Sequence, residues 1–201
     1  MRIGLTGPIG CGKSTIARWL GERPGVVVVD ADQVARDVLD RGRPALDAVV
    51  ARFGEEMVRP GGELDRAALG RLVFADPVAL RDLEAIVHPA VRPRILSSIA
   101  KADADGATAV VIEAIKLVEG GLADDCDEVW LVTCDPATQR ARLIGRGLSA
   151  VDIAQRMAAQ LDLVSRIRPG ATRSIDSSGD PTATRRVVDT AFAAAVLAWH
   201  P

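Results

Sequence analysis

The chain has 201 residues, a formal net charge of −2 and 48% apolar residues. This length and composition are typical of one domain with a substantial hydrophobic core, and so small a net charge argues against a protein built to coat nucleic acid. Aromatic residues make up only 3% of the chain, which disfavours a surface for stacking single-stranded bases.

The first predicted elements are a strand over residues 2–6, a glycine-rich loop and a helix over residues 14–20. The loop GPIGCGKS fits G-x-x-x-x-G-K-[ST], a pattern whose backbone N–H groups surround nucleotide phosphates. In such a loop Lys13 reaches the β- and γ-phosphates, and the Ser14 hydroxyl binds Mg²⁺. A glycine turn without a ligand is the alternative, and the strand–loop–helix context argues against it. The residues predicted to bind the nucleotide are Gly7, Gly10, Cys11, Gly12, Lys13, Ser14 and Thr15.

A second strand is predicted over residues 26–30, and the continuous run of valines predicts burial on both faces, as in a parallel sheet. Two carboxylates, Asp30 and Asp32, follow the valines. One of them is expected to act as general base for an acceptor hydroxyl, and the other to serve a metal ion or water. Either could instead cap a helix that begins near Gln33. We favour Asp32 as the base because it lies farther past the strand, although the roles could be exchanged or shared.

The stretch from residue 33 to residue 104 reads as several helices without a convincing strand, with breaks at sites such as His88-Pro89. An insertion at this point of an α/β chain lies over the carboxyl ends of the strands, where ligands bind. Arg66 is a candidate for binding an anionic substrate, although the Asp65-Arg66 pair could equally cap a helix. His88 is a weaker candidate, because a lone histidine more often has a structural role.

Further strands are predicted over residues 109–112 and 128–132, with a weaker one over 172–176 and a closing helix over 181–199. Between them, Arg142 and Arg146 stand four residues apart, so both project from one face of a helix. Two guanidinium groups on a mobile helical lid can hold a transferring phosphoryl group, whereas the alternative is a solvated arginine face.

The predicted architecture is therefore α/β: a three-layer P-loop kinase fold with a parallel sheet, a helical insertion and a helical lid. We expect the 201 residues to form a single domain. Its core covers about 1–32, 105–137 and 169–201, its insertion about 33–104, and its lid about 138–168.

The three cysteines show no Cys-x-x-Cys spacing, which favours neither a disulfide framework nor a zinc site. No apolar run reaches the length of a membrane span, and the chain begins with a strand-like run where a signal peptide would carry basic residues. We therefore expect a cytoplasmic protein, monomeric or weakly self-associating, that binds neither membranes nor nucleic acid.

Taken in order, several motifs resemble the dephospho-CoA kinase family. They are GLTGPIGCGKST, VVVDAD, the FG of residues 53–54, the LDR of residues 64–66, LEAIVHP at residues 83–89, and the glutamine- and arginine-containing stretch 139–166. The resemblance implies ATP-dependent phosphorylation of the ribose 3′-hydroxyl of dephospho-CoA, the last step of coenzyme A synthesis, with ATP and Mg²⁺ as cofactors. It also implies that Asp32 is the base and that the helical insertion lies on the CoA side.

The chain departs from the family pattern at two places. Ile115-Lys116 stands where the family usually has proline and leucine, which bears on local substrate contacts. Thr172 and Ser177 stand where an aspartate and an asparagine are typical, so recognition of the base is expected to use backbone groups.

Two other functions are compatible with a phosphate-binding loop. One is a different small-metabolite kinase, similar to shikimate kinase, although an insertion of about 70 residues is long for a connection in a compact domain. The other is a nucleotide-binding switch or regulator. A GTP switch usually selects guanine through an Asn-Lys-x-Asp segment, and this chain contains no asparagine.

Overall fold

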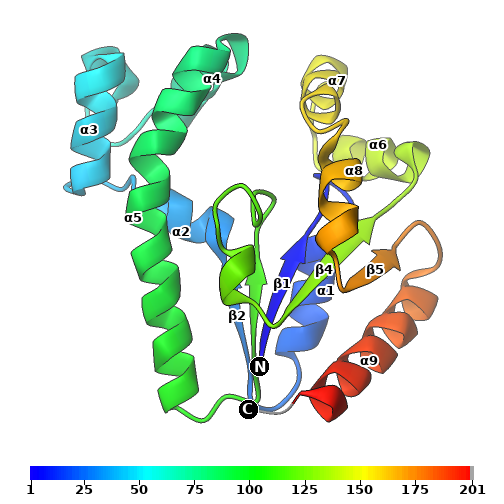
Figure 1. Cartoon of the computed structure of the whole chain (residues 1–201). Coiled ribbons are helices and arrows are strands. Elements are labelled where there is room, and N and C mark those ends of the chain that lie inside the picture. Colours follow the sequence, from blue (N-terminus) through cyan, green and yellow to red (C-terminus); the bar gives the residue numbers. More distant parts are fainter. Residues whose placement is uncertain (200–201) are drawn as a thin grey trace. The chain divides into compact units, whose positions relative to one another are not determined.

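The computed structural model describes residues 1–199, and the chain divides into two compact units. The core unit comprises Met1–Asp30 and the chain from Lys101 onward, and the helical unit comprises Ala31–Ala100. Figure 1 shows the elements of both units. Within residues 1–199, no helix has both the length and the apolar composition needed to cross a bilayer.

The core unit is built on five parallel strands in the order β2-β3-β1-β4-β5 (Figure 1). The strands are β1 (Arg2–Thr6), β2 (Val26–Asp30), β3 (Ala109–Glu113), β4 (Glu128–Thr133) and β5 (Arg173–Asp176). The helices are α1 (Lys13–Gly21), α6 (Pro136–Gly145), α7 (Ala150–Ala158), α8 (Leu163–Ile167) and α9 (Pro181–Ala198). The predicted α/β architecture with a parallel sheet is thereby confirmed. Because the strands are parallel, all their carboxyl ends lie at one edge of the sheet.

Both faces of the sheet bury apolar side chains. On one face, α1 and α9 supply residues such as Ile16, Leu20, Val188 and Phe192 to the core. The sheet residues in this core are Ile3, Leu5, Ala109, Val111, Trp130, Val132 and Ile175. On the other face, Leu117 packs so closely on β1 that a Cβ atom at Gly4 would lie 2.5 Å from its Cδ2 atom.

The predicted burial of the valine run on both faces is wrong for its middle. Val27 and Val28 are 38% and 37% exposed, whereas Val29 is buried. The reason is the position of β2, which pairs with β3 alone and forms one end of the sheet. A strand at the end of a sheet has a neighbour on one side only, and the local sequence does not encode that position.

The helical unit contains α2 (Ala31–Asp37), α3 (Pro44–Phe53) and α4 (Arg66–Ala75), and most of α5 (Pro77–Ala104). Asp65 caps α4, because its Oδ1 atom accepts hydrogen bonds from the backbone N–H groups of Ala67 and Ala68 at 3.1 and 2.9 Å. The cap matches one of the two roles considered for the Asp65-Arg66 pair. Buried apolar residues of this unit include Leu46, Val49, Phe53, Leu69 and Val73.

Helix α5 is continuous where the sequence predicted a break. It runs from Pro77 to Ala104 and contains Pro89 and Pro93, each of which removes one backbone N–H donor from the helix. Val91, Ile95 and Ile99 are buried and recur every four residues, on one stripe of the helix. Burial of this stripe stabilises the helical conformation and offsets the two lost hydrogen bonds.

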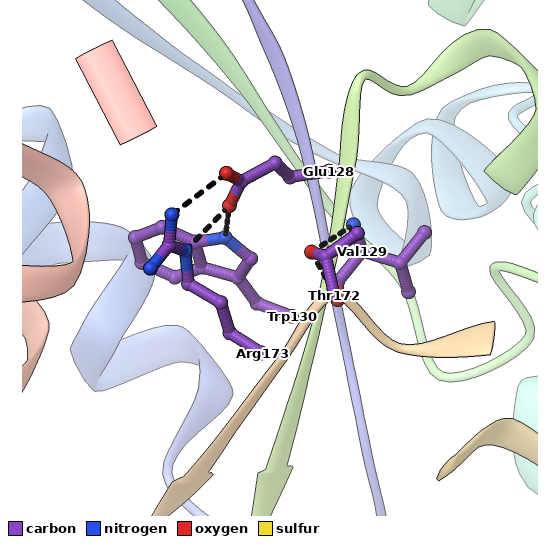
Figure 2. A network of polar contacts seen from close by, with 5 residues as sticks. All are labelled: Glu128, Val129, Trp130, Thr172 and Arg173. Carbon is purple, nitrogen blue, oxygen red and sulfur yellow. Dashed lines mark hydrogen bonds and ion pairs between the residues drawn. The ribbon is translucent and has the colours of Figure 1, made fainter. Parts of the chain in front are cut away.

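A polar network ties the amino ends of β4 and β5 together (Figure 2). The guanidinium of Arg173 donates hydrogen bonds to both carboxylate oxygens of Glu128 at 2.7 and 2.9 Å, and the indole N–H of the buried Trp130 also donates to Glu128. The hydrogen bonds from Arg173, with that from Trp130, hold the pKa of Glu128 below its usual value. Beside them, the Thr172 hydroxyl exchanges hydrogen bonds with the backbone of Val129.

We expect the network to make stability depend on pH. The folded-state pKa of Glu128 is depressed, so its ionisation stabilises the fold above the unfolded-state value of 4.5, and this contribution is lost as pH falls through the folded-state pKa. Glu128→Gln should therefore lower the free energy of unfolding by roughly 2 kcal/mol at pH 7. The difference from the unaltered protein should shrink below pH 4.5. Urea unfolding at several pH values measures both effects.

Glu22→Gln is the matched control. The ion pair of Glu22 with Arg185 is as short, at 2.7 Å, but both of its side chains are exposed to solvent. An exposed pair contributes at most about 1 kcal/mol. The stabilising role of ionised Glu128 would be contradicted if both variants lost the same free energy of unfolding. It would also be contradicted if the loss in Glu128→Gln did not change with pH.

Candidate functional site

The glycine-rich loop connects β1 to α1 at the carboxyl edge of the sheet. Gly7 has a φ of 142°, and a Cβ atom there would lie 2.0 Å from the carbonyl oxygen of Val132, so only glycine fits. Gly12, with a φ of 88°, is the N-cap of α1, and no side chain caps that helix. The first turn of α1 also lacks acidic residues. The N–H groups and the helix dipole therefore favour an anion at this point.

Lys13 is held inside the loop. Its side chain is buried, and its ammonium donates hydrogen bonds to the carbonyl oxygens of Gly7 and Pro8 at 2.8 and 3.1 Å. The positive charge consequently lies next to the loop N–H groups. A phosphate bound by those N–H groups would meet the ammonium directly.

Ser14 and Glu113 form a pair of oxygen donors beside the loop. The Ser14 hydroxyl donates a 2.6 Å hydrogen bond to the Glu113 carboxylate. Glu113 ends β3, and the parallel register places it beside Leu5 of β1 and Asp30 of β2. A hydroxyl and a carboxylate are hard oxygen ligands, which suit Mg²⁺. Sequence reasoning missed Glu113 because it ended the third strand at Ile112.

Arg142 of α6 is anchored to the end of β5. Its guanidinium donates to the hydroxyl and to the carbonyl oxygen of Ser177 at 2.9 and 2.6 Å, and the Ser177 hydroxyl donates to the carbonyl oxygen of Cys11 at 2.7 Å. Ser177 thus links the loop to the predicted lid arginine. Arg142 and Arg146 share a cavity of about 410 Å³, lined by Gly12, Thr15, Ile16, Trp19, Arg142, Gly145, Arg146, Ser177, Pro181 and Thr184.

Two glutamines from the predicted lid segment bind the backbone of Ile9 in the loop. The Gln139 side-chain amide donates to the Ile9 carbonyl oxygen at 2.7 Å. The Ile9 N–H donates to the Gln160 side-chain oxygen at 2.8 Å. The backbone N–H and the carbonyl oxygen of Ile9 are therefore both bound by side chains that lie more than a hundred residues away in the chain. The sequence placed both glutamines in the lid segment and assigned neither a role.

A second cavity, of about 360 Å³, lies in the helical unit and brings together Asp32, Arg66 and His88. Asp32 lies in the first turn of α2, and Arg66 begins α4. The Arg66 guanidinium donates to the Arg36 carbonyl oxygen at 2.9 Å. The apolar part of the lining comprises Ala35, Leu39, Leu64, Leu69, Val73, Phe74, Leu80, Leu83 and Val87. Asp30 does not line this cavity but ends β2 in the core unit.

The departures from the family pattern differ in their distance from the loop. Thr172 lies immediately before β5, where its hydroxyl exchanges hydrogen bonds with the backbone of Val129, and the expectation that backbone groups recognise the base stays a prediction. Lys116 is exposed, and the neighbouring Ile115 carbonyl accepts a hydrogen bond from Thr6 at the end of β1. Among these positions, Ser177 contacts the loop through its side chain.

Ser177→Ala should weaken ATP binding. The substitution removes the hydroxyl that bonds to both Arg142 and Cys11, and a hydrogen bond to a charged group contributes enough to raise KM for ATP about tenfold. Steady-state kinetics measure KM and kcat separately. Ser178→Ala is the control, since that hydroxyl bonds to Asp135 and Asp176 and does not contact the loop. An unchanged KM in Ser177→Ala would contradict a positioning role.

Comparison with known proteins places these features in a family. The model of the dephospho-CoA kinase family matches residues 1–180. A dephospho-CoA kinase of Symbiobacterium thermophilum is 47% identical over 194 residues, covering 96% of this chain and 80% of that protein. A dephospho-CoA kinase of Geobacter metallireducens is 45% identical over 187 residues, covering 92% of each.

Solved structures show the same fold. TT1252 from Thermus thermophilus matches with a TM-score of 0.78 at 32% identity, covering 96% of this chain and 97% of that one. A dephospho-CoA kinase from Campylobacter jejuni matches with a TM-score of 0.70 at 23% identity, covering 97% and 96%. A shikimate kinase from Bacteroides thetaiotaomicron has a TM-score of 0.53 at 15% identity, covering 97% and 98%. The last two likenesses concern the fold alone.

Proposed function

Because this chain belongs to the dephospho-CoA kinase family, we propose that it transfers the γ-phosphoryl group of ATP to the ribose 3′-hydroxyl of dephospho-CoA. The products are coenzyme A and ADP. The chain is a kinase of coenzyme A biosynthesis, and the observation that carries this conclusion is the family match over residues 1–180.

The core unit binds and activates the nucleotide. The loop N–H groups from Gly10 to Thr15 hold the phosphates, and Lys13 neutralises charge on the β- and γ-phosphates. Arg142 and Arg146 line the adjoining cavity, where they contact the nucleotide and stabilise the charge of the transferring group. The anchoring of Arg142 to Ser177 orients that guanidinium before ATP binds, which lowers the entropy lost on binding.

Mg²⁺ is the metal that this donor set fits. Ser14 would hold it, with the Glu113 carboxylate beside the hydroxyl at 2.6 Å. When bound, the ion neutralises charge on the β- and γ-phosphate oxygens. Within residues 1–199 no group of three or more histidine, cysteine or acidic side chains forms a metal cage, which agrees with a cation held mainly by phosphates and water.

The helical unit binds the acceptor. Asp32 removes the proton of the ribose 3′-hydroxyl as that oxygen attacks the γ-phosphorus, and Asp30, which ends β2 in the core unit, binds the substrate or serves a metal ion or water. Arg66 binds an anionic group of dephospho-CoA, and His88 contacts the same substrate. This assignment is supported by the cavity of the helical unit, which combines Asp32, Arg66 and His88 with apolar walls, as an amphipathic substrate requires. Closure of the predicted lid, about residues 138–168, would exclude water from the transferring phosphoryl group and so prevent wasteful hydrolysis of ATP.

The proposal includes a cytoplasmic location and a monomer or weak homo-oligomer. Coenzyme A synthesis requires ATP and small soluble substrates and no membrane or nucleic acid partner. Sedimentation of the purified chain, with and without ATP, tests the oligomeric state.

Incubation with ATP, Mg²⁺ and dephospho-CoA tests the proposed reaction. Mass spectrometry should find one phosphate added to the acceptor for each ADP formed, and phosphorus NMR should place it on the 3′-oxygen. Parallel incubations with shikimate and with nucleosides should form no stoichiometric ADP. Phosphorylation of one of those acceptors, with dephospho-CoA unchanged, would overturn the proposal.

A further inference from the structure

Two cysteines meet beneath the nucleotide loop. The Sγ atom of Cys11, in the loop, lies 2.7 Å from the Sγ atom of Cys134, the residue that follows β4. The two positions are 123 residues apart in the chain and are brought together by the pairing of β1 with β4. The phosphate chemistry proposed above gives Cys134 no role.

We propose that Cys11 and Cys134 are a redox modification site, at which a small disulfide compound oxidises the two thiols to an intrachain disulfide that weakens ATP binding. The sulfur–sulfur distance must shorten from 2.7 Å to about 2.05 Å, a movement that side-chain rotation and small backbone shifts provide. Cysteine pairs that oxidise inside cells are typically transient and regulatory.

The two sulfur atoms differ in access and in acidity. Cys11 is 1% exposed, whereas Cys134 is partly exposed. The hydrogen bond from the Cys134 thiol, with the nearby charges of Lys13 and Arg142, lowers the pKa of Cys11, and the same hydrogen bond raises the pKa of Cys134. The partly exposed Cys134 sulfur therefore lies against the buried Cys11 sulfur, which ionises more readily. In such a pair, Cys11 can displace an adduct that forms on Cys134.

The exchange proceeds in two balanced steps. The Cys134 thiol loses its proton to solvent as its sulfur attacks a small disulfide RSSR, the S–S bond of RSSR breaks, and RS⁻ leaves and takes up a proton. Cys11 sulfur then attacks the Cys134 sulfur of the mixed disulfide, loses its proton to solvent, and expels the second RS⁻. Two protein thiols are oxidised, and RSSR is reduced to two RSH.

The location of the pair connects its oxidation to ATP. Cys11 lies between Gly10 and Gly12, whose φ angles are 80° and 88°, and its carbonyl oxygen accepts the Ser177 hydrogen bond that also positions Arg142. A disulfide fixes the Cβ–S–S–Cβ dihedral angle and ties this segment of the loop to the end of β4. Because loss of one hydrogen bond between a loop N–H group and a charged phosphate is enough to weaken binding about tenfold, we expect oxidation to raise the Kd for ATP by that factor or more.

The test treats the full-length chain with hydroxyethyl disulfide and follows its intact mass and its Kd for ATP. We expect loss of two hydrogen atoms, a peptide linking Cys11 to Cys134, and a Kd that rises at least about tenfold and recovers after reduction. Cys134→Ala should bind ATP normally and keep that affinity during treatment. Cys126→Ser should form the same link, because the Cys126 thiol donates its hydrogen bond to the Leu122 carbonyl oxygen and takes no part in the pair.

Three outcomes would overturn the proposal: no link between the two residues, a stable adduct on Cys134 that Cys11 does not resolve, or a complete link with unchanged Kd. Circular dichroism of Cys134→Ala checks its fold, and Cys134→Ser serves in its place if that variant is unstable. None of these readouts requires phosphorylation of dephospho-CoA, so failure of the proposed function would leave them interpretable.

Discussion

Asp32→Asn is expected to lower kcat for phosphorylation of dephospho-CoA by about 10²–10⁴-fold, the range that a positioned general base contributes. Asparagine keeps the size and polarity of the side chain in the first turn of α2 but cannot accept the hydroxyl proton. The Kd for ATP should stay within about twofold, because the nucleotide is bound by groups of the core unit. Rapid-quench kinetics measure the chemical step, and calorimetric titration measures the Kd.

Asp37→Asn on the same helix is the matched control. Asp37 accepts a hydrogen bond from Gln33 and does not line the cavity of the helical unit, so its variant should keep kcat. Near-normal turnover in Asp32→Asn, or an equal loss in Asp37→Asn, would contradict the assignment.

Lys13→Ala should have the next largest effect, a loss of kcat of about 10²–10³-fold, comparable with removing one preorganised donor to a developing charge. The ammonium lies within the loop, bonded to the carbonyl oxygens of Gly7 and Pro8, so the variant loses the positive charge held at that point. Arginine should not rescue the activity, because its planar guanidinium is bulkier than the ammonium and this position is buried.

Lys101→Ala is the control for charge alone, because Lys101 is exposed and pairs only with the exposed Asp105 among the contacts that the structure records. Thermal unfolding of both variants separates loss of activity from loss of fold. A Lys13→Ala enzyme that retains kcat at saturating ATP would show that the lysine contributes to ground-state binding and not to the transition state.

The features that sequence predicted well are local. The loop was recognisable because its glycines and Lys13 are contiguous and its neighbours have the periodicities of a strand and a helix. The alternation of apolar runs with helical segments gave the parallel sheet. Asp32, Arg66 and His88, which sequence nominated separately, line one cavity of the helical unit.

The features that sequence missed depend on register and long-range packing. Glu113 looked like the polar end of an apolar run, and only the pairing of β3 with β1 brings it to Ser14. Ser177 was noted as a departure, but its link between Cys11 and Arg142 needs the end of β5, the loop and α6 together. Gln139 contacts the loop 130 residues away, beyond any local pattern.

Two wrong expectations have the same origin. The exposure of Val27 and Val28 follows from the place of β2 at the end of the sheet, which depends on the strand order. The continuity of α5 through Pro89 and Pro93 follows from burial of the stripe that contains Ile95. In both cases tertiary context decided against the local preference.

The central position of β1 has a consequence for synthesis on the ribosome. Arg2 pairs with Val110, and Ile3 pairs with Glu128, so β1 has no sheet partner until more than a hundred further residues have emerged. At the usual translation rates this takes roughly 5–20 seconds. Ala31–Ala100, a compact unit of its own, leaves the ribosome during that interval. During that interval β1 is an apolar strand whose backbone N–H and carbonyl groups have no sheet partner.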